Sequence, residues 1–250
     1  MPGRTVWRAY RDRSRSTPNR RRYPAAMTRC ASERNFPKPG LGWTAPEPVN
    51  CRLETGRLLI RAYTLEDAPA LLEAIRASLD HLLPWMPWAT GHTSVAFTTK
   101  YIAEQMLAQS GGEKFNNIGV GIFDKATGEF LGGTGVHDIR RDTASCETGY
   151  WIRYDRVGRG YASEACARVL SWALGDPNAG GLGLRRVRIY CSSANVPSSR
   201  IPERLGLTPE VRQRQDYYVE GHGPTDRLGW GVMSDEWDCV NHRRVVSESA

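Results

Sequence analysis

The sequence predicts an α/β fold, a mixed and mostly antiparallel central sheet of about six to seven strands with helices on both faces. Strand-like stretches follow one another as a meander through the middle of the chain, and a strand–helix–strand unit comes after them, an order typical of such a sheet. The composition supports a packed core, because 40% of the 250 residues are hydrophobic and 24% are charged. It excludes a wholly disordered chain. No stretch approaches the roughly 18 consecutive apolar residues of a membrane span, so we expect no membrane association.

The first strand is expected at residues 58–62, where three large apolar residues lie together. A helix follows with Thr64 as its N-cap and acidic residues in its first turn, where the helix dipole favours them. Its apolar spacing predicts one buried face made of Leu65, Ala68, Leu71, Leu72, Ile75 and Leu79. A second helix is expected at about 94–110, with its apolar residues on one side: Phe97, Tyr101, Ile102, Met106 and Leu107.

The rest of the sheet is expected to begin with a hairpin, two strands at about 116–124 and 129–139. Gly128 in the turn between them can take a positive φ. The later elements follow in this order: a strand at 146–153, a helix at 161–174, a strand at 184–192 that alternates apolar and basic residues, a short helix ending near Gly206, and strands at about 211–219 and 226–235. The chain shows no internal repeat.

The net charge of +7 is concentrated at the start of the chain. Residues 1–50 hold eleven basic and three acidic residues, whereas the remaining residues hold 23 basic and 24 acidic ones. We expect residues 1–50 to be a disordered Arg- and Pro-rich extension, because they show no helical or strand period. It could be a solvated leader, an artefact of a start upstream of Met27, an arm that contacts RNA or the ribosome, or a transit peptide. Residues 51–240 are then the folded domain and 241–250 a flexible tail.

The six cysteines are scattered and form no C-x-x-C pair. This pattern argues against a disulfide scaffold or a zinc knuckle, and it makes a reducing cytoplasm the expected compartment. His81 and His137 have no second ligand at metal-binding spacing, so we expect no metal site.

The most informative stretch is the Gly–Arg–Gly turn at residues 158–160, where a strand ends and a helix starts at once. Glycines let the backbone approach a ligand closely, and the free N–H groups at a helix N-terminus can hold an anion. The alternative is an ordinary strand-to-helix turn. Two phosphate-binding patterns are absent from the sequence, because there is neither a G-x-x-x-x-G-K-[ST] motif nor a third glycine to complete G-x-G-x-x-G.

Several segments carry a family resemblance when they are taken in order: Thr55-Gly56-Arg57-Leu58-Leu59-Ile60-Arg61, His81-Leu82-Leu83-Pro84-Trp85-Met86-Pro87-Trp88, Gly132-Gly133-Thr134-Gly135, Glu147-Thr148-Gly149-Tyr150-Trp151, Gly158-Arg159-Gly160-Tyr161-Ala162, Asn195-x-x-Ser198-x-Arg200 and Glu203-Arg204-Leu205-Gly206-Leu207. On these segments, residues of about 53–238 resemble the GNAT superfamily of acetyl-CoA-dependent N-acetyltransferases. Within the superfamily they look most like the RimJ/RimL type, which acetylates the N-termini of ribosomal proteins. The resemblance implies the GNAT fold and acetyl-CoA as co-substrate.

The resemblance also implies which residues hold the coenzyme. Main-chain N–H groups of the loop would bind the pyrophosphate, here Val157, Gly158, Arg159, Gly160, Tyr161 and Ala162. The pantetheine would lie along the strand edge formed by Tyr150, Trp151 and Ile152. Asn195 falls where the family places a side chain on the pantetheine, and Arg200 of the same motif joins the cofactor-binding residues.

By the same resemblance, Glu147 would accept the proton of the amine, and Ser198 would place a hydroxyl near the thiolate. The acceptor groove would be lined by Trp85, Trp88, His81 and Tyr217. Each assignment has a structural alternative. Glu147 could be a solvated or salt-bridged carboxylate, the tryptophans could cap the core, and Tyr217 could lie on a plain strand edge.

Three residues depart from the family pattern. Val157 stands where the loop usually starts with Arg or Gln, Pro202 stands where many members carry a Tyr general acid, and Leu207 replaces the usual Phe. Proline clashes within a helix interior and lacks an N–H. We therefore expect the short helix to begin late, with Ser199 as its N-cap and Pro202 in its first turn.

The expected activity is transfer of an acetyl group to a primary amine, either a protein N-terminal α-amine or a small-molecule amine. Using an α-amine in its neutral form at pH 7 costs about 1.3 kcal/mol, against about 4.6 kcal/mol for a Lys side chain. The departures at Val157 and Pro202 leave open a catalytically weak CoA-binding module that the basic arm attaches to RNA or the ribosome. We expect a monomer or a homodimer.

Overall fold

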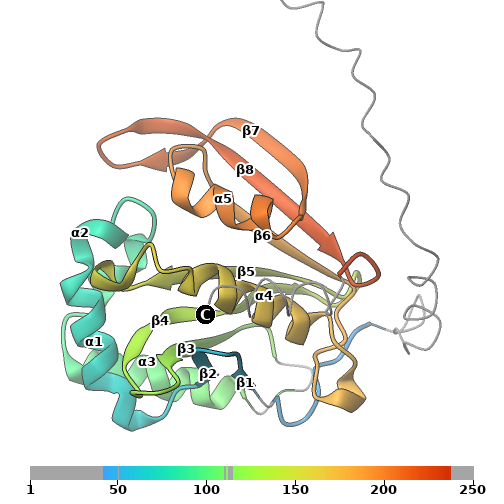
Figure 1. The fold of residues 1–250 in the computed structure, drawn as a ribbon, viewed down its shortest axis with the longest axis horizontal. Coiled ribbons are helices and arrows are strands. Elements are labelled where there is room, and N and C mark those ends of the chain that lie inside the picture. Colours follow the sequence, from blue (N-terminus) through green and yellow to red (C-terminus); the bar gives the residue numbers. More distant parts are fainter. Residues whose placement is uncertain (1–41, 50, 110, 112–114, 238–250) are drawn as a thin grey trace, which may run out of the picture. The chain divides into compact units, whose positions relative to one another are not determined.

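The central sheet of the computed structural model has eight strands among the described residues, which are 42–49, 51–109, 111 and 115–237 (Figure 1). The strands are β1 Arg52–Glu54, β2 Leu58–Ala62, β3 Ile118–Asp124, β4 Phe130–Arg140, β5 Ser145–Ile152, β6 Arg186–Ser192, β7 Thr208–Val219 and β8 Gly223–Met233. Their order in the sheet is β1-β2-β3-β4-β5-β6-β8-β7, and all neighbours are antiparallel except β5 and β6. This confirms the expected mixed, mostly antiparallel sheet. Strand β1 is one more than we expected.

The α-helices are α1 Ala68–Ala77, α2 Leu79–Leu82, α3 Val95–Ala108, α4 Tyr161–Ala173 and α5 Val196–Arg204. Short 3₁₀ helices, η2 Leu65–Asp67, η3 Pro87–Gly91, η4 Tyr154–Arg156 and η5 Pro177–Ala179, occur in the connections. Thr64 is the N-cap of η2, which leads directly into α1, whereas the N-cap of α1 itself is Asp67. The main-chain N–H of Thr64 donates to Asp67 Oδ2 at 2.8 Å. None of the described helices is long and apolar enough to cross a membrane.

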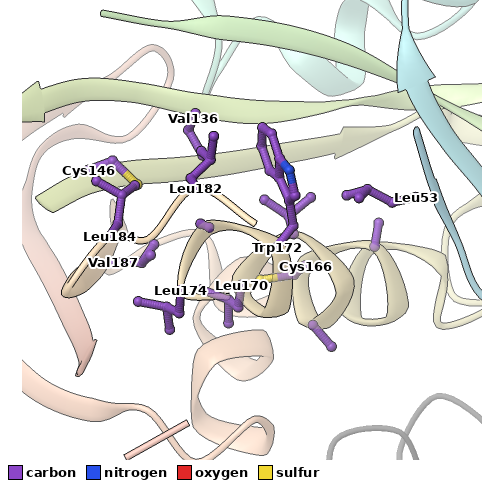
Figure 2. Packing of buried hydrophobic residues seen from close by; sticks show 14 of the residues in the cluster. Leu53, Val136, Cys146, Cys166, Leu170, Trp172, Leu174, Leu182, Leu184 and Val187 are labelled. Atoms are coloured by element: carbon purple, nitrogen blue, oxygen red, sulfur yellow. The ribbon is translucent and has the colours of Figure 1, made fainter. Parts of the chain in front are cut away.

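The two faces of the sheet carry separate hydrophobic cores. Helix α4 covers one face with Cys166, Leu170 and Trp172, which pack against Val136, Cys146 and Val187 of the strands (Figure 2). Helices α1 and α3 cover the other face, where their buried residues meet aromatic side chains of β3 and β4: Leu71, Ala74, Ile75, Ile102, Phe123 and Phe130. The helices therefore lie on both faces, as the sequence predicted.

The packed region begins before residue 51, where we expected the domain to start. Trp43 is only 3% exposed and joins the α4-side core together with Ala45 and Val49. Its indole N–H donates to the carbonyl of Leu182 at 2.8 Å. The expectations for the basic extension up to residue 41 and for the tail at 241–250 lie outside the described residues.

The predicted apolar faces were partly wrong. Leu65 is 47% exposed because it lies in η2, ahead of α1, where the 3.6-residue period has not yet begun. On α3 only Thr98 and Ile102 are buried, whereas Phe97, Met106 and Leu107 are exposed. Phe97 faces an open cleft described below, which explains why an apolar residue there stays accessible.

Helix α5 begins earlier than we expected, and this overturns the proposed placing of Pro202. Asn195 is its N-cap, with Oδ1 accepting from the Ser198 N–H at 3.2 Å, so Ser199 is not the cap. Pro202 is the seventh residue of the helix and lies inside it. The missing N–H of Pro202 is thus tolerated beyond the first turn of the helix.

Candidate active site

A cleft opens where β5 and β6 diverge. Their parallel pairing covers three positions and ends at Glu147 and Arg188. Beyond that point the described residues of β5 pair only with β4, and those of β6 pair only with β8. The cleft has a volume of about 620 Å³, and its walls come from β3 to β6, α1, α3, the loop after α2, the start of α5 and Tyr217 of β7.

Glu147 faces this cleft at the point of divergence. Its carboxylate lies 3.3 Å from the Nε2 atom of His137, its cross-strand partner on β4. The Glu147 side chain is 20% exposed and the His137 side chain 48%. The pair therefore meets the cleft as a half-buried carboxylate with an imidazole beside it, a combination that can accept and pass on a proton. Sequence reasoning missed His137, because the pair becomes visible only when the β4–β5 register is known.

Ser198 lies at the α5 side of the cleft, close to Cys191 and Asn195. Its main-chain N–H is capped by Asn195, and its carbonyl accepts from the Tyr150 hydroxyl at 3.2 Å. Burial raises the pKa of the Cys191 thiol, which lines the same part of the cleft, to about 11. Cys191 is thus a protonated, unreactive thiol near neutral pH. The hydroxyl of Ser198 is the other side-chain group that the two residues bring to this part of the cleft.

The loop between β5 and α4 has the shape that the Gly–Arg–Gly motif predicted. Gly158 and Gly160 adopt φ values of 77° and 82°, which only glycine takes without strain. Gly160 is also the N-cap of α4. No described residue accepts a hydrogen bond from the main-chain N–H groups of residues 158–163. These groups and the helix N-terminus form a ready anion-binding site.

A buried ion pair ties this loop to the turn before β2. Glu164 of α4 is 2% exposed and accepts from Arg57 Nη2 at 2.6 Å, Arg57 Nε at 2.8 Å and Thr55 Oγ1 at 2.5 Å. Arg57 Nη1 also donates to the carbonyl of Arg159 at 3.1 Å, and its guanidinium lies 4.8 Å from the ring centre of Tyr161. The Thr55-Gly56-Arg57 segment therefore fixes the loop in place.

Aromatic side chains make up much of the lining of the cleft. Three of the four residues predicted for the acceptor groove, Trp85, Trp88 and Tyr217, line the cleft. The Tyr217 hydroxyl donates to the carbonyl of Trp85 at 3.2 Å, so β7 and the loop after α2 meet at the rim. Trp88 makes an edge contact with Trp151, with ring centres 6.1 Å apart. Further lining residues escaped sequence reasoning because they are far apart in the chain: Tyr63, His92, Tyr101 and Gln105.

Four groups of predicted site residues lie outside the lining of the cleft. His81 packs on the ring of Tyr154, with centres 5.7 Å apart. Ile152 is 6% exposed and belongs to the α4-side core. Arg200 is exposed, and its carbonyl accepts from Arg204. The loop at 157–162 lies beside the cleft but does not line it.

No cluster of three or more metal-binding side chains occurs among the described residues. In the cleft itself, the described lining residues include one carboxylate, that of Glu147, and no Lys or Arg side chain. The Glu147 carboxylate can therefore attract a positively charged amine, and no Lys or Arg of the described lining opposes it.

Comparison with known proteins identifies the family of this chain. A family model described as "Acetyltransferase (GNAT) domain" matches residues 57–208. The chain is 26% identical over 181 residues to the putative ribosomal N-acetyltransferase YdaF of Bacillus subtilis (strain 168), a match that covers 72% of this chain and 93% of that protein.

Two solved structures share the fold at lower identity. RimL, a ribosomal L7/L12 alpha-N-protein acetyltransferase in complex with coenzyme A, has a TM-score of 0.63 and 21% identity, and covers 73% of this chain and 97% of its own. The microcin C7 self-immunity acetyltransferase MccE, in complex with acetyl-CoA and AMP, has a TM-score of 0.61 and 18% identity, and covers 71% and 93%.

Proposed function

Because this chain belongs to the GNAT acetyltransferase family and is an acetyl-CoA-dependent N-acetyltransferase, we propose that its acceptor is the α-amine at a protein N-terminus. The observation that carries this proposal is the chemistry of the cleft, which has one half-buried carboxylate beside an imidazole and no Lys or Arg among the described lining residues. RimL is named as an alpha-N-protein acetyltransferase, which supports this class of acceptor, and YdaF is named as a putative ribosomal N-acetyltransferase.

The cleft chemistry favours an α-amine over a Lys side chain. Only the neutral amine attacks a thioester, and neutralising an α-amine at pH 7 costs about 1.3 kcal/mol, against about 4.6 kcal/mol for Lys. Glu147 has a single imidazole partner and is partly solvated. A base of this kind suits the acceptor that already loses its proton near neutral pH.

Two features of the chain fit acetyl-CoA. The free N–H groups of residues 158–163 suit a pyrophosphate, and a Cβ at Gly158 would meet no atom within 4 Å, which leaves room beside the loop. The edge of β5 beyond Glu147 faces the cleft without a partner strand from β6, which suits an extended amide chain such as pantetheine. Bound acetyl-CoA supplies an acetyl group that is activated as a thioester.

In the proposed reaction the amine nitrogen forms a bond to the acetyl carbon, and the bond from that carbon to sulfur breaks. Glu147 takes the proton of the amine, directly or through one water, and His137 holds the carboxylate in place and can carry the proton onward. Ser198 offers its hydroxyl to the departing sulfur, with solvent as the alternative proton source. No tyrosine acid is needed, because a thiolate with a pKa of about 8.5 leaves readily.

The proposed acceptor groove lies along Trp85, Trp88 and Tyr217. The bond from Tyr217 to the Trp85 carbonyl closes the rim between β7 and the loop after α2. A groove closed on this side favours an acceptor that enters end-on, as a free N-terminus does. His81 and Arg200 lie outside the cleft lining, and we give them no role in it.

A thiol-release assay with matched hexapeptides tests the proposal. We expect a peptide with a free α-amine and no Lys to be acetylated at least tenfold faster than the same peptide with a blocked N-terminus and one Lys. Faster turnover of the blocked peptide, or of small primary amines alone, would overturn it. If CoA binds in calorimetry and no amine is acetylated, the chain is the weak CoA-binding module, and its RNA contact would have to come from the basic extension outside the described residues.

A further inference from the structure

Pro202 leaves a gap in the hydrogen-bonding of α5. In a regular helix the N–H of residue 202 would donate to the carbonyl of residue 198, but proline has no N–H. The helix continues on both sides of Pro202, from Val196 to Arg204, and Pro202 is buried. The Ser198 carbonyl is therefore left without its usual donor at a part-buried position, where an unsatisfied group is costly.

The Tyr150 hydroxyl fills that gap from a different element. It donates to the Ser198 carbonyl at 3.2 Å, across 48 residues of sequence. Tyr150 lies on β5 beyond the point where β5 and β6 diverge, so its side chain reaches α5 across the inner end of the cleft. Burial raises the pKa of Tyr150 well above its ordinary value, which keeps the proton on the phenol throughout the neutral range.

The bond acts on a residue that the proposed reaction uses. Two hydrogen bonds hold the main chain of Ser198: its N–H donates to Asn195, and its carbonyl accepts from Tyr150. The first of these bonds comes from the N-cap of the same helix. Only the Tyr150 contact ties Ser198 to β5, the strand that carries Glu147. The distance between the two proposed chemical groups is thus set in part by this hydrogen bond.

We infer that Tyr150 is a positioning residue, whose hydroxyl replaces the N–H that Pro202 lacks and holds Ser198 against the β5 side of the cleft. This inference rests on the proposed function for its effect on turnover, but the structural coupling between positions 150 and 202 stands without it. The inference also explains how the helix accommodates Pro202, the departure from the family pattern. The Tyr150 hydroxyl bonds the free carbonyl, and the helix does not need to start late.

A double-substitution cycle tests the inference. Tyr150→Phe removes the hydroxyl and keeps the ring and the main chain. Pro202→Ala restores an N–H at the position that can donate to Ser198. Pro197→Ala is the matched control, because Pro197 lies in the first turn of the same helix, where an added N–H gains no helical acceptor. The variants are made singly and as the two pairs with Tyr150→Phe.

In the turnover assay we expect Tyr150→Phe to lower kcat about tenfold, a loss typical of a small displacement in an active site, with the KM for acetyl-CoA within about twofold of wild type. Adding Pro202→Ala should bring kcat back to within about twofold, and adding Pro197→Ala should not. A loss in kcat with little change in KM, together with rescue by Pro202→Ala alone, distinguishes a positioning role of Tyr150 from a general loss of structure.

Thermal unfolding gives the readout that does not depend on catalysis. Tyr150→Phe should lower the midpoint by about 3 °C in the Pro202 protein, and by less than about 1 °C when residue 202 is Ala. An equal loss in both backgrounds overturns the inference, as does rescue by Pro197→Ala. If no amine is acetylated even by wild type, the proposed function fails, while the unfolding cycle still decides whether Tyr150 replaces the missing N–H.

Discussion

Arg57→Ala is the most direct test of how the coenzyme loop is held. The substitution removes the two guanidinium bonds to Glu164 and the bond to the Arg159 carbonyl. It leaves the Glu164 carboxylate, which is 2% exposed, with Thr55 as its remaining side-chain donor. An unpaired buried carboxylate is among the most destabilising features a single substitution can create.

The exposure of the ion pair sets the expected loss in the free energy of unfolding. Breaking a fully buried pair costs about 3–5 kcal/mol. The Arg57 side chain is 24% exposed, so water reaches part of the pair, and the lower end, about 3 kcal/mol, applies. For a domain of this size that loss lowers the unfolding midpoint by roughly 6–12 °C. CoA affinity should fall as well, because the loop loses its tie to Arg159.

Two further variants separate stability from loop position in this experiment. Replacing both partners with apolar residues, Arg57→Met with Glu164→Leu, should restore most of the stability while CoA affinity stays low. Arg52→Ala breaks the exposed Arg52–Glu54 pair and should shift the midpoint by no more than about 2 °C. Differential scanning fluorimetry and calorimetry with CoA supply both readouts. Our reasoning is refuted if Arg57→Ala melts within 1 °C of wild type, or binds CoA as wild type does.

Gly160→Val should weaken CoA binding in calorimetry far more than Arg159→Ala does. The φ of Gly160 is 82°, which valine does not adopt without strain, whereas Arg159 contributes a main-chain N–H whatever its side chain. Equal dissociation constants would contradict an anion site built from main-chain N–H groups. Glu147→Gln should lower turnover at pH 7 about 10²-fold, with partial recovery at higher pH, and Ser198→Ala should lower it about tenfold. If the turnover of Glu147→Gln is near normal across pH 6–9, the carboxylate has a structural role only. Burial lowers the pKa of His92, so its imidazole binds a proton more readily in the unfolded chain than in the folded one. The free energy of unfolding is therefore highest above about pH 6.5 and falls as the pH decreases toward the folded-state pKa. The unfolding midpoint should therefore drop between pH 7.5 and 5.5, and by less in His92→Phe, whereas identical slopes would exclude His92 as the cause.

The order of the elements could be read from local pattern. Turn residues such as Gly128 and caps such as Thr64 act over a few residues, so their signals survive without tertiary context. The Gly158–Gly160 turn was predicted for the same reason, since a positive φ is a property of the residue itself. Burial was harder to predict, because an apolar residue such as Phe97 can line an open cleft.

The partners inside the site could not be predicted from local pattern. The contact between Glu147 and His137 depends on strand register, which a one-residue slip would abolish. Pro202 could not be placed from local pattern either. Local sequence disfavours proline in a helix interior because a carbonyl loses its donor, but here the hydroxyl of Tyr150, on another element, donates to that carbonyl.

The divergence of β5 and β6 couples the coenzyme to the thermodynamics of folding. A ligand that fills the gap takes up main-chain groups that a neighbouring strand would otherwise occupy, and it binds only the folded chain. Free coenzyme at 100 times its dissociation constant would then add about 2.7 kcal/mol to the free energy of unfolding. Amide hydrogens of β5 beyond Glu147 would exchange with solvent more slowly as the coenzyme concentration rises, so this segment would report occupancy in the absence of any acceptor.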